Sequence, residues 1–268
     1  GAIEGASLEA NKGAYSYAWM IIFAVIAAIM VLIGLYHIRM LPSNQIPSTT
    51  KKTTSEVGRE LVAVIANFFT KKHIFYYICF IILYRLAEGF IMKIAPLFLR
   101  ASREVGGLGL SLKEIGTLNG VFGSAAFVLG SLLAGIYVSK FGLKRTLFTL
   151  CCIFNLPFVA YTFLAVTQPT NVYLIGTCIT MEYFGYGFGF VGLTLFMMQQ
   201  IAPGKHQMSH YAFASGIMNL GVMLPGMVSG YFSDLLGYRN FFIYVLIATI
   251  PAFLITYFIP FTYDDSKK

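Results

Sequence analysis

Two acidic residues and one arginine lie inside stretches of sequence that are otherwise apolar. Arg85 and Glu88 belong to Leu-Tyr-Arg-Leu-Ala-Glu-Gly, and Glu182 belongs to Met-Glu-Tyr-Phe-Gly-Tyr-Gly-Phe-Gly. An ionised side chain in the middle of a bilayer costs at least about 2.5–3.5 kcal/mol. Because a proton neutralises a carboxylate, Glu88 and Glu182 are candidate proton-coupling residues. The spacing of three places Arg85 and Glu88 on one helix face, where they either pair with each other or line a polar path.

Side chains near these charges offer groups that would bind a solute. Arg85 would bind a carboxylate or phosphate, or hold Glu88 ionised until a proton arrives. The other predicted substrate-binding residues are Tyr84, Tyr183, Tyr186, Asn119 and Asn219. Tyrosine rings and hydroxyls are typical of sugar and peptide sites. The alternative is structural: an asparagine inside a span commonly bonds a neighbouring helix, and Glu182 would be a hydrogen-bonding residue in a tight helix contact.

Four glycines follow Glu182 at close spacing. They are Gly185, Gly187, Gly189 and Gly192. Each weakens a helix by about 1 kcal/mol relative to alanine. In a membrane such glycines permit either a close approach of two helices or a local break that exposes backbone groups.

The composition indicates an integral membrane protein. Charged residues make up 11% of the 268 residues and hydrophobic ones 57%, and the mean hydropathy is +0.74. Soluble domains carry about 25% charged residues. The four cysteines lie in apolar runs, and no zinc-binding spacing, phosphate-binding loop or Ser/His/Asp order is found. We therefore expect no metal, no cofactor and no enzymatic activity.

Seven apolar stretches are each long enough to cross the hydrocarbon core. They are residues 14–36, 74–97, 115–138, 146–166, 172–201, 211–232 and 241–261. The predicted fold is an all-α polytopic membrane helix bundle, divided into residues 1–37, a polar linker at 38–73, and six helices at 74–268. Within the linker, residues 56–70 are expected to form an amphipathic interfacial helix. Because the chain starts at Gly1 without a methionine or a cleavable signal, we expect it to be part of a longer protein.

Lysine and arginine are distributed unevenly among the loops. Twelve lie on the side of the long linker, five lie on the other side, and Arg85 and Lys93 are within a span. Cytoplasmic loops carry the excess of basic residues, so the linker and the C-terminus are predicted to be cytoplasmic. A basic cytoplasmic face accounts for much of the net charge of +8, without a nucleic-acid partner.

Two segments 95 residues apart share one pattern. The first contains Gly135, Ser139, Gly142, Lys144 and Arg145, and the second contains Gly230, Asp234, Gly237 and Arg239. The same offset places Glu88 next to Glu182. On the predicted topology the first copy is cytoplasmic and the second external. A three-helix unit repeated with inverted orientation is typical of secondary transporters.

The first copy resembles the loop motif of the major facilitator superfamily, G-x-x-x-D-[RK]-x-G-[RK]-[RK], with Ser139 in place of its aspartate. One helix, a long loop and six helices would correspond to the sixth helix, central loop and C-terminal half of that twelve-helix fold. Four segments look more narrowly like AmpG-type muropeptide permeases: residues 84–88, 103–110, 182–190 and 224–230. This resemblance implies proton-driven import of anhydro-muropeptides, which are peptidoglycan fragments, across the bacterial inner membrane. It also implies an N-terminal six-helix half as partner.

Three other functions are weighed against this reading. A major facilitator carrier would also fit another anionic solute, such as acetyl-CoA or a sugar derivative. A non-transporting receptor or scaffold would retain the helices without the transport cycle. An intramembrane lipid-modifying enzyme would need a nucleophile or a His/Asp cluster, and the sequence shows neither.

Overall fold

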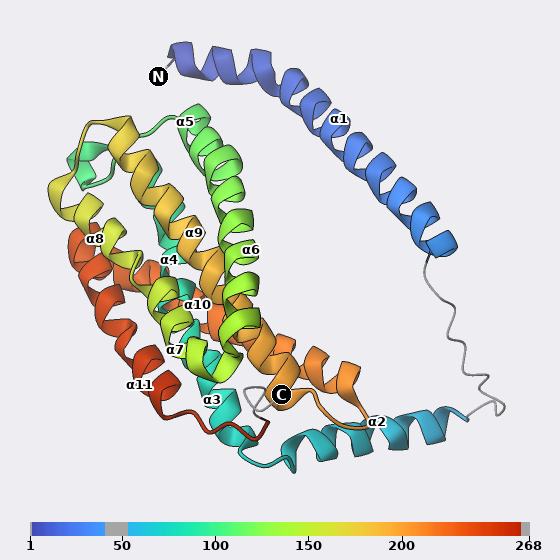
Figure 1. Cartoon of the computed structure of the whole chain (residues 1–268). Helices are drawn as coiled ribbons and strands as arrows, with labels where there is room; N and C mark the ends of the chain where they lie inside the picture. Colours follow the sequence, from blue (N-terminus) through green and yellow to red (C-terminus); the bar gives the residue numbers. More distant parts are fainter. Residues whose placement is uncertain (1, 41–52, 264–268) are drawn as a thin grey trace. The chain divides into compact units, whose positions relative to one another are not determined.

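The computed structural model describes residues 2–40 and 53–263, and every regular element in these ranges is a helix (Figure 1). The chain divides into two compact units, Gly1–Thr53 and Thr54–Lys268. The first unit consists of α1 (Ala2–Met40), which includes the apolar stretch Ser16–Met40. Within residues 16–40 the apolar side chains are exposed on all sides of the helix, as expected for a helix that faces lipid.

The predicted linker is described only in part, because residues 41–52 lie outside the described ranges. Its second part forms α2 (Thr54–Phe69), in agreement with the expected amphipathic helix. Val64 and Phe68 are buried within the second unit, to which α2 belongs, whereas Leu61 and Val62 are exposed.

Twelve further elements follow α2 in the described part of the chain. They are α3 (Ile74–Tyr84), α4 (Leu86–Arg100), the 3-10 helix η1 (Arg103–Val105), α5 (Leu112–Thr117), the π-helix η2 (Leu118–Gly123), α6 (Ser124–Phe141), α7 (Leu143–Asn155), α8 (Phe158–Thr167), α9 (Val172–Phe196), the π-helix η3 (Met197–Ile201), α10 (Gln207–Ala248) and α11 (Ile250–Phe258).

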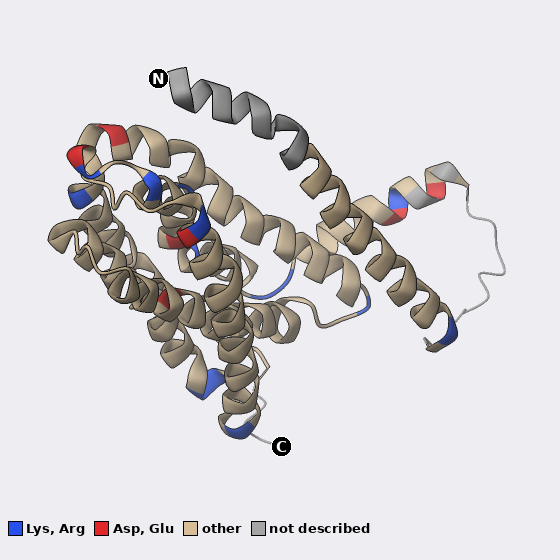
Figure 2. Ribbon diagram, turned by 90° about the horizontal axis from the view of Figure 1, so that it is seen from above, with Lys and Arg blue, Asp and Glu red and all other residues tan. Residues whose placement is uncertain are grey.

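The all-α, polytopic character predicted from the sequence is confirmed. Five described stretches are long and apolar enough to span a membrane. One of them, Gln207–Phe258, covers the predicted span 211–232 and most of the predicted span 241–261, and between these two the backbone leaves the helical conformation at Gly237. Helix α9 is 25 residues long but is not among the five, since Glu182 and its glycines and tyrosines lower its hydropathy. Charged residues are sparse along the long helices (Figure 2).

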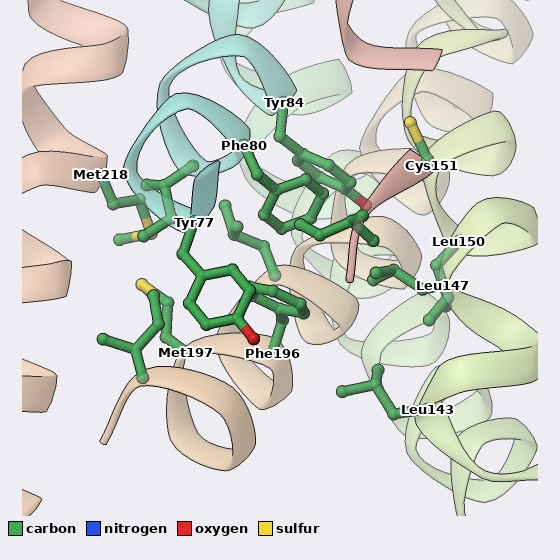
Figure 3. Close-up of a cluster of buried hydrophobic side chains, with 14 of the residues drawn as sticks. Tyr77, Phe80, Tyr84, Leu143, Leu147, Leu150, Cys151, Phe196, Met197 and Met218 are labelled. Atoms are coloured by element: carbon green, nitrogen blue, oxygen red, sulfur yellow. The ribbon is translucent and has the colours of Figure 1, made fainter. Parts of the chain in front are cut away.

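Aromatic residues on one face of α3 build the core where α3, α7 and α9 meet. Tyr77, Phe80 and Tyr84 recur at helical spacing and are fully buried, so they lie on the same face. The ring centroid of Phe196, at the end of α9, lies 4.5 Å from that of Phe80 and 5.2 Å from that of Tyr77 (Figure 3). A second buried cluster joins α4, α8 and α10.

The helix pairs follow the 95-residue repeat. Helix α6 packs along α9, and the first part of α10 packs along α4. Under the offset of 95, α6 corresponds to the first part of α10, and α4 corresponds to α9. Each of the two close pairs therefore consists of one helix from the first repeat and one helix from the second. The inverted orientation of the repeats and the domain boundaries stay predictions.

Candidate functional site

The helix expected across residues 74–97 is interrupted at Arg85. Helix α3 ends at Tyr84 and α4 begins at Leu86, with Arg85 between them at φ −102° and ψ 4°. This backbone region is sparsely populated and is frequent at functional positions. The break places Glu88 in the first turn of α4, where the positive end of the helix dipole favours a carboxylate.

Arg85 and Glu88 form a buried ion pair. The guanidinium Nε donates to Glu88 Oε2 at 2.6 Å, and a second guanidinium nitrogen donates to Oε1. Only 4% of Arg85 and 5% of Glu88 are exposed. The guanidinium carbon also lies 5.4 Å from the centroid of the Phe190 ring, a favourable cation–π position. The two charges neutralise each other, so Arg85 is not available as a free cation.

A cavity of about 140 Å³ lies beside this pair. It is lined by side chains from α4, η2, α8 and α9. Its polar residues are Glu88, Asn119, Tyr161, Glu182, Tyr183 and Tyr186. Since a water molecule takes up about 30 Å³ of liquid, the cavity has room for a few waters or one substituent of a solute. It is too small for a whole drug-sized ligand, which needs about 300–1,000 Å³.

Glu182 extends into the cavity from the middle of α9. Among the described residues it has no hydrogen bond and no ion pair, in contrast to Glu88. The two carboxylates are close enough for their charges to interact. A carboxylate with a like charge nearby and no basic partner is expensive when ionised. This is the arrangement expected of a residue that takes up a proton.

Asn119 brings an unpaired acceptor to the same cavity. It lies in η2, a π-helical turn within a longer helix, and such turns are frequent at functional sites. Its Oδ1 atom is buried and has no hydrogen-bond partner in the described part of the chain. Because a buried polar atom without a partner costs about 1–3 kcal/mol, this oxygen is suited to accept a hydrogen bond from water or from a bound solute.

Two tyrosines are positioned by close packing. A Cβ atom at Gly123 would lie 2.9 Å from Cγ of Tyr183, so only glycine in η2 leaves room for this ring. Tyr186 interacts with both Arg85 and Glu88, and its ring centroid lies 5.2 Å from that of Phe127. Both tyrosine rings are therefore held at the cavity wall.

Three predicted binding residues lie outside this cavity. Tyr84 is fully buried, and its hydroxyl donates to the carbonyl of Gly189 at 2.9 Å, so it holds α3 against α9. Arg85 is occupied by Glu88. Asn219 is exposed on α10. Sequence reasoning missed Tyr161 of α8, which lines the cavity, because nothing distinguishes it from the other aromatic residues of its stretch.

The glycines of α9 serve close helix packing, which decides between the two alternatives left open by the sequence. A Cβ atom at Gly187 would lie 2.1 Å from the carbonyl oxygen of Phe127 in α6, and one at Gly185 would lie 2.4 Å from that of Ile153 in α7. Helix α9 continues without a break to Phe196.

The repeated motif places two glycines in the same backbone conformation. Gly142 ends α6 at φ 77° and ψ 148°, and Gly237 interrupts α10 at φ 69° and ψ 160°. Both angles lie in a region that glycine adopts without strain. Gly135, Ser139, Gly142 and Arg145 line a second cavity at the joint of α6 and α7. Gly230 and Asp234 are exposed on α10, as is Lys144 on α7.

Comparison with known proteins agrees with the resemblance seen in the sequence. The chain is 23% identical over 209 residues to the anhydromuropeptide permease of Escherichia coli, a match that covers 78% of this chain and 41% of the permease. It is 25% identical over 238 residues to the putative transporter AmpG 1 of Rickettsia bellii, covering 87% of this chain and 56% of that protein.

A third relative is the putative transporter AmpG 2 of Rickettsia prowazekii, which is 27% identical over 204 residues and covers 74% of this chain and 47% of that protein. The chain is similar to AmpG-type muropeptide permeases. It spans about half the length of these AmpG-type relatives. Their names denote transporters rather than enzymes, in agreement with the expected absence of enzymatic activity. No family model matches the chain.

Proposed function

We propose that this chain is part of a proton-coupled secondary transporter that imports peptidoglycan turnover products, such as anhydro-muropeptides, across the bacterial inner membrane. Residues 74–268 would be its C-terminal six-helix half, residues 1–37 the helix that precedes the central linker, and an N-terminal six-helix half its partner. The linker and the C-terminus would face the cytoplasm.

The observation that carries this proposal is the cavity shared by Glu88 and Glu182. Glu88 is neutralised by Arg85, whereas Glu182 has no basic partner among the described residues. Glu182 is therefore the residue that we expect to take up the transported proton. Proton uptake would remove the cost of an unpaired negative charge in the cavity, and thereby bias the rocking of one half against the other.

The polar groups of the cavity suit an uncharged part of a glycopeptide. Asn119 offers an unpaired acceptor, and Tyr183 and Tyr186 offer hydroxyls and flat rings. Hydroxyl and amide groups of a sugar or peptide would donate to Asn119 and lie against these rings. No cation among the lining residues is free to bind an anionic group. The residues that line the cavity are thus better suited to bind an amino-sugar or peptide moiety than a phosphate.

Uptake into proteoliposomes tests the proposal. The longer protein that contains this chain should concentrate labelled anhydro-muropeptide when a pH gradient is imposed, and a protonophore should abolish the accumulation. The 268-residue chain alone should not transport, because sites of this fold lie between two halves. Accumulation that survives the protonophore would refute proton coupling, and preferential uptake of acetyl-CoA would refute the proposed substrate.

A further inference from the structure

A second cavity of about 550 Å³ lies where α6 ends and α7 begins. Its walls come from the end of α6, the first residues of α7 and the C-terminal part of α9 with η3. One part of the wall is apolar and includes Val191 and Leu195, and the other is polar and includes Lys140, Arg145 and Gln199. The volume falls within the range of about 300–1,000 Å³ found for small-molecule sites.

The charges at this cavity are all positive. Lys140 and Arg145 line it, and no carboxylate does. Within the described part of the chain, neither residue has an ion pair or hydrogen bond. Ser139 also lines the cavity, and its hydroxyl donates to the carbonyl of Ile136 at 2.8 Å, so it adds no charge. The cavity is therefore suited to an anion.

The two copies of the motif share a backbone conformation but differ in the charges of their side chains. Gly142 and Gly237 share one conformation. At the positions equivalent to Ser139, Lys140 and Arg145, however, the second copy has Asp234, Leu235 and Asn240. The second copy thus carries an acid where the first carries none, and lacks both bases.

The position and the walls of the cavity identify its occupant. The apolar stretch Leu112–Phe141 ends at this joint, and Leu143–Thr167 begins there, so the cavity lies at the level where spans leave the hydrocarbon. Phe141 is half exposed beside it. A phospholipid combines a phosphate, which needs cations, with methylene groups, which need an apolar wall such as Val191 and Leu195. Basic pockets between spans on the cytoplasmic side bind anionic headgroups.

We propose that the cavity formed by Lys140, Arg145 and the apolar face of α9 binds the phosphate of an anionic phospholipid. The headgroup lies between the two basic side chains, and the glycerol and first methylene groups lie along Val191 and Leu195. This site is separate from the cavity of Glu88 and Glu182, and its test does not depend on transport.

Native mass spectrometry of the purified 268-residue chain in detergent tests this site. Phosphatidylglycerol and phosphatidylcholine with the same acyl chains are added separately. One phosphatidylglycerol molecule should be retained about 30-fold more strongly than phosphatidylcholine, given roughly 1 kcal/mol per basic residue near an anionic lipid. The double variant Lys140→Ala/Arg145→Ala should lose this preference. Equal retention of the two lipids by the unchanged chain would overturn the proposal.

Two further variants make the test specific. Ser139→Asp introduces the acid that the second copy has at Asp234, on an exposed position that requires no repacking, and should reduce retention at least fivefold. Arg239→Ala removes the base of the second copy that corresponds to Lys144, which does not line the cavity, and it should leave retention unchanged. An equal loss with Arg239→Ala would show a general charge effect and contradict the site. Displacement of the lipid by millimolar inorganic phosphate would assign the cavity to a free anion instead.

Discussion

Glu88 and Glu182 line one cavity from two different helices, but only Glu88 has a basic partner. In the longer protein, Glu182→Gln should therefore mimic permanent protonation: solute exchange should persist, and uphill accumulation should fall at least tenfold. Glu88→Gln should also reduce accumulation, and in addition leave Arg85 unpaired. Exchange and pH-driven uptake of labelled anhydro-muropeptide are measured in proteoliposomes. If both variants concentrate the solute at wild-type rates, these acids are structural.

The buried pair itself should be important for stability. Arg85→Met leaves the Glu88 carboxylate buried without its partner, and breaking a buried pair in this way costs about 3–5 kcal/mol. The double variant Arg85→Met/Glu88→Leu removes both charges and should recover most of the loss. The Tm in detergent is measured for each variant. A double variant as unstable as Arg85→Met would show that packing, and not the charge, is responsible.

Gly123 should be needed to position Tyr183. Gly123→Ala forces the ring of Tyr183 away, because the new Cβ would lie 2.9 Å from its Cγ. We expect weaker solute binding and a lower Tm. Gly120→Ala is the matched control, since it lies in the same π-helical turn and its Cβ would meet nothing within 4 Å. Equal effects of the two substitutions would mean that the turn, rather than Tyr183, is affected.

The predicted topology can be tested with single cysteines at exposed positions. Ser55, in α2, and Lys113, in α5, are both exposed and are predicted to lie on opposite sides of the membrane. In intact cells an impermeant thiol reagent should label Lys113→Cys but not Ser55→Cys, above the background of the parent chain. Ser55→Cys should react once the membrane is permeabilised. The reverse pattern would invert the assigned orientation.

Lys71 should give stability a measurable pH dependence. Its ammonium donates to the carbonyls of Ile201 and Pro203, and burial lowers its pKa from 10.5. The unfolded chain therefore binds more protons in the interval between the lowered pKa and 10.5, so the free energy of unfolding should rise with pH there. The rise in Tm should be small, because Lys71 is only partly buried. It should disappear in Lys71→Met and persist in Lys72→Met, a change at its exposed neighbour.

The sequence was sufficient to predict those cavity residues that are polar within an otherwise apolar stretch. Glu88, Glu182 and Asn119 are polar residues in apolar stretches, and the structure brings all three together. Tyr183 and Tyr186 follow from their position next to Glu182 on one helix.

The directions of other side chains could not be predicted, because they depend on breaks in the helices. No glycine or proline lies at Arg85 to indicate that the helix is interrupted there. The interruption separates Tyr84, which faces the core, from Glu88, which faces the cavity. Tyr161 reaches the cavity through the packing of α8, and periodicity within one helix carries no information about such contacts. The glycines of α9 are equally ambiguous until α6 and α7 are in place.

The pairing of Arg85 with Glu88 also has an electrical consequence. Since these two charges cancel, Glu182 is the only residue among those lining the cavity in the described chain that adds net charge. A membrane potential acts on net charge, at about 2.3 kcal/mol per elementary charge per 100 mV across the full field. When Glu182 is protonated, the residues that line the cavity, taken together with Arg85, carry no net charge, so their movement through the membrane field moves no charge. In the proposed cycle the membrane potential therefore acts on the ionised Glu182 and drives the return of the empty carrier. The charges of the cavity residues make no contribution to the voltage dependence of the loaded step.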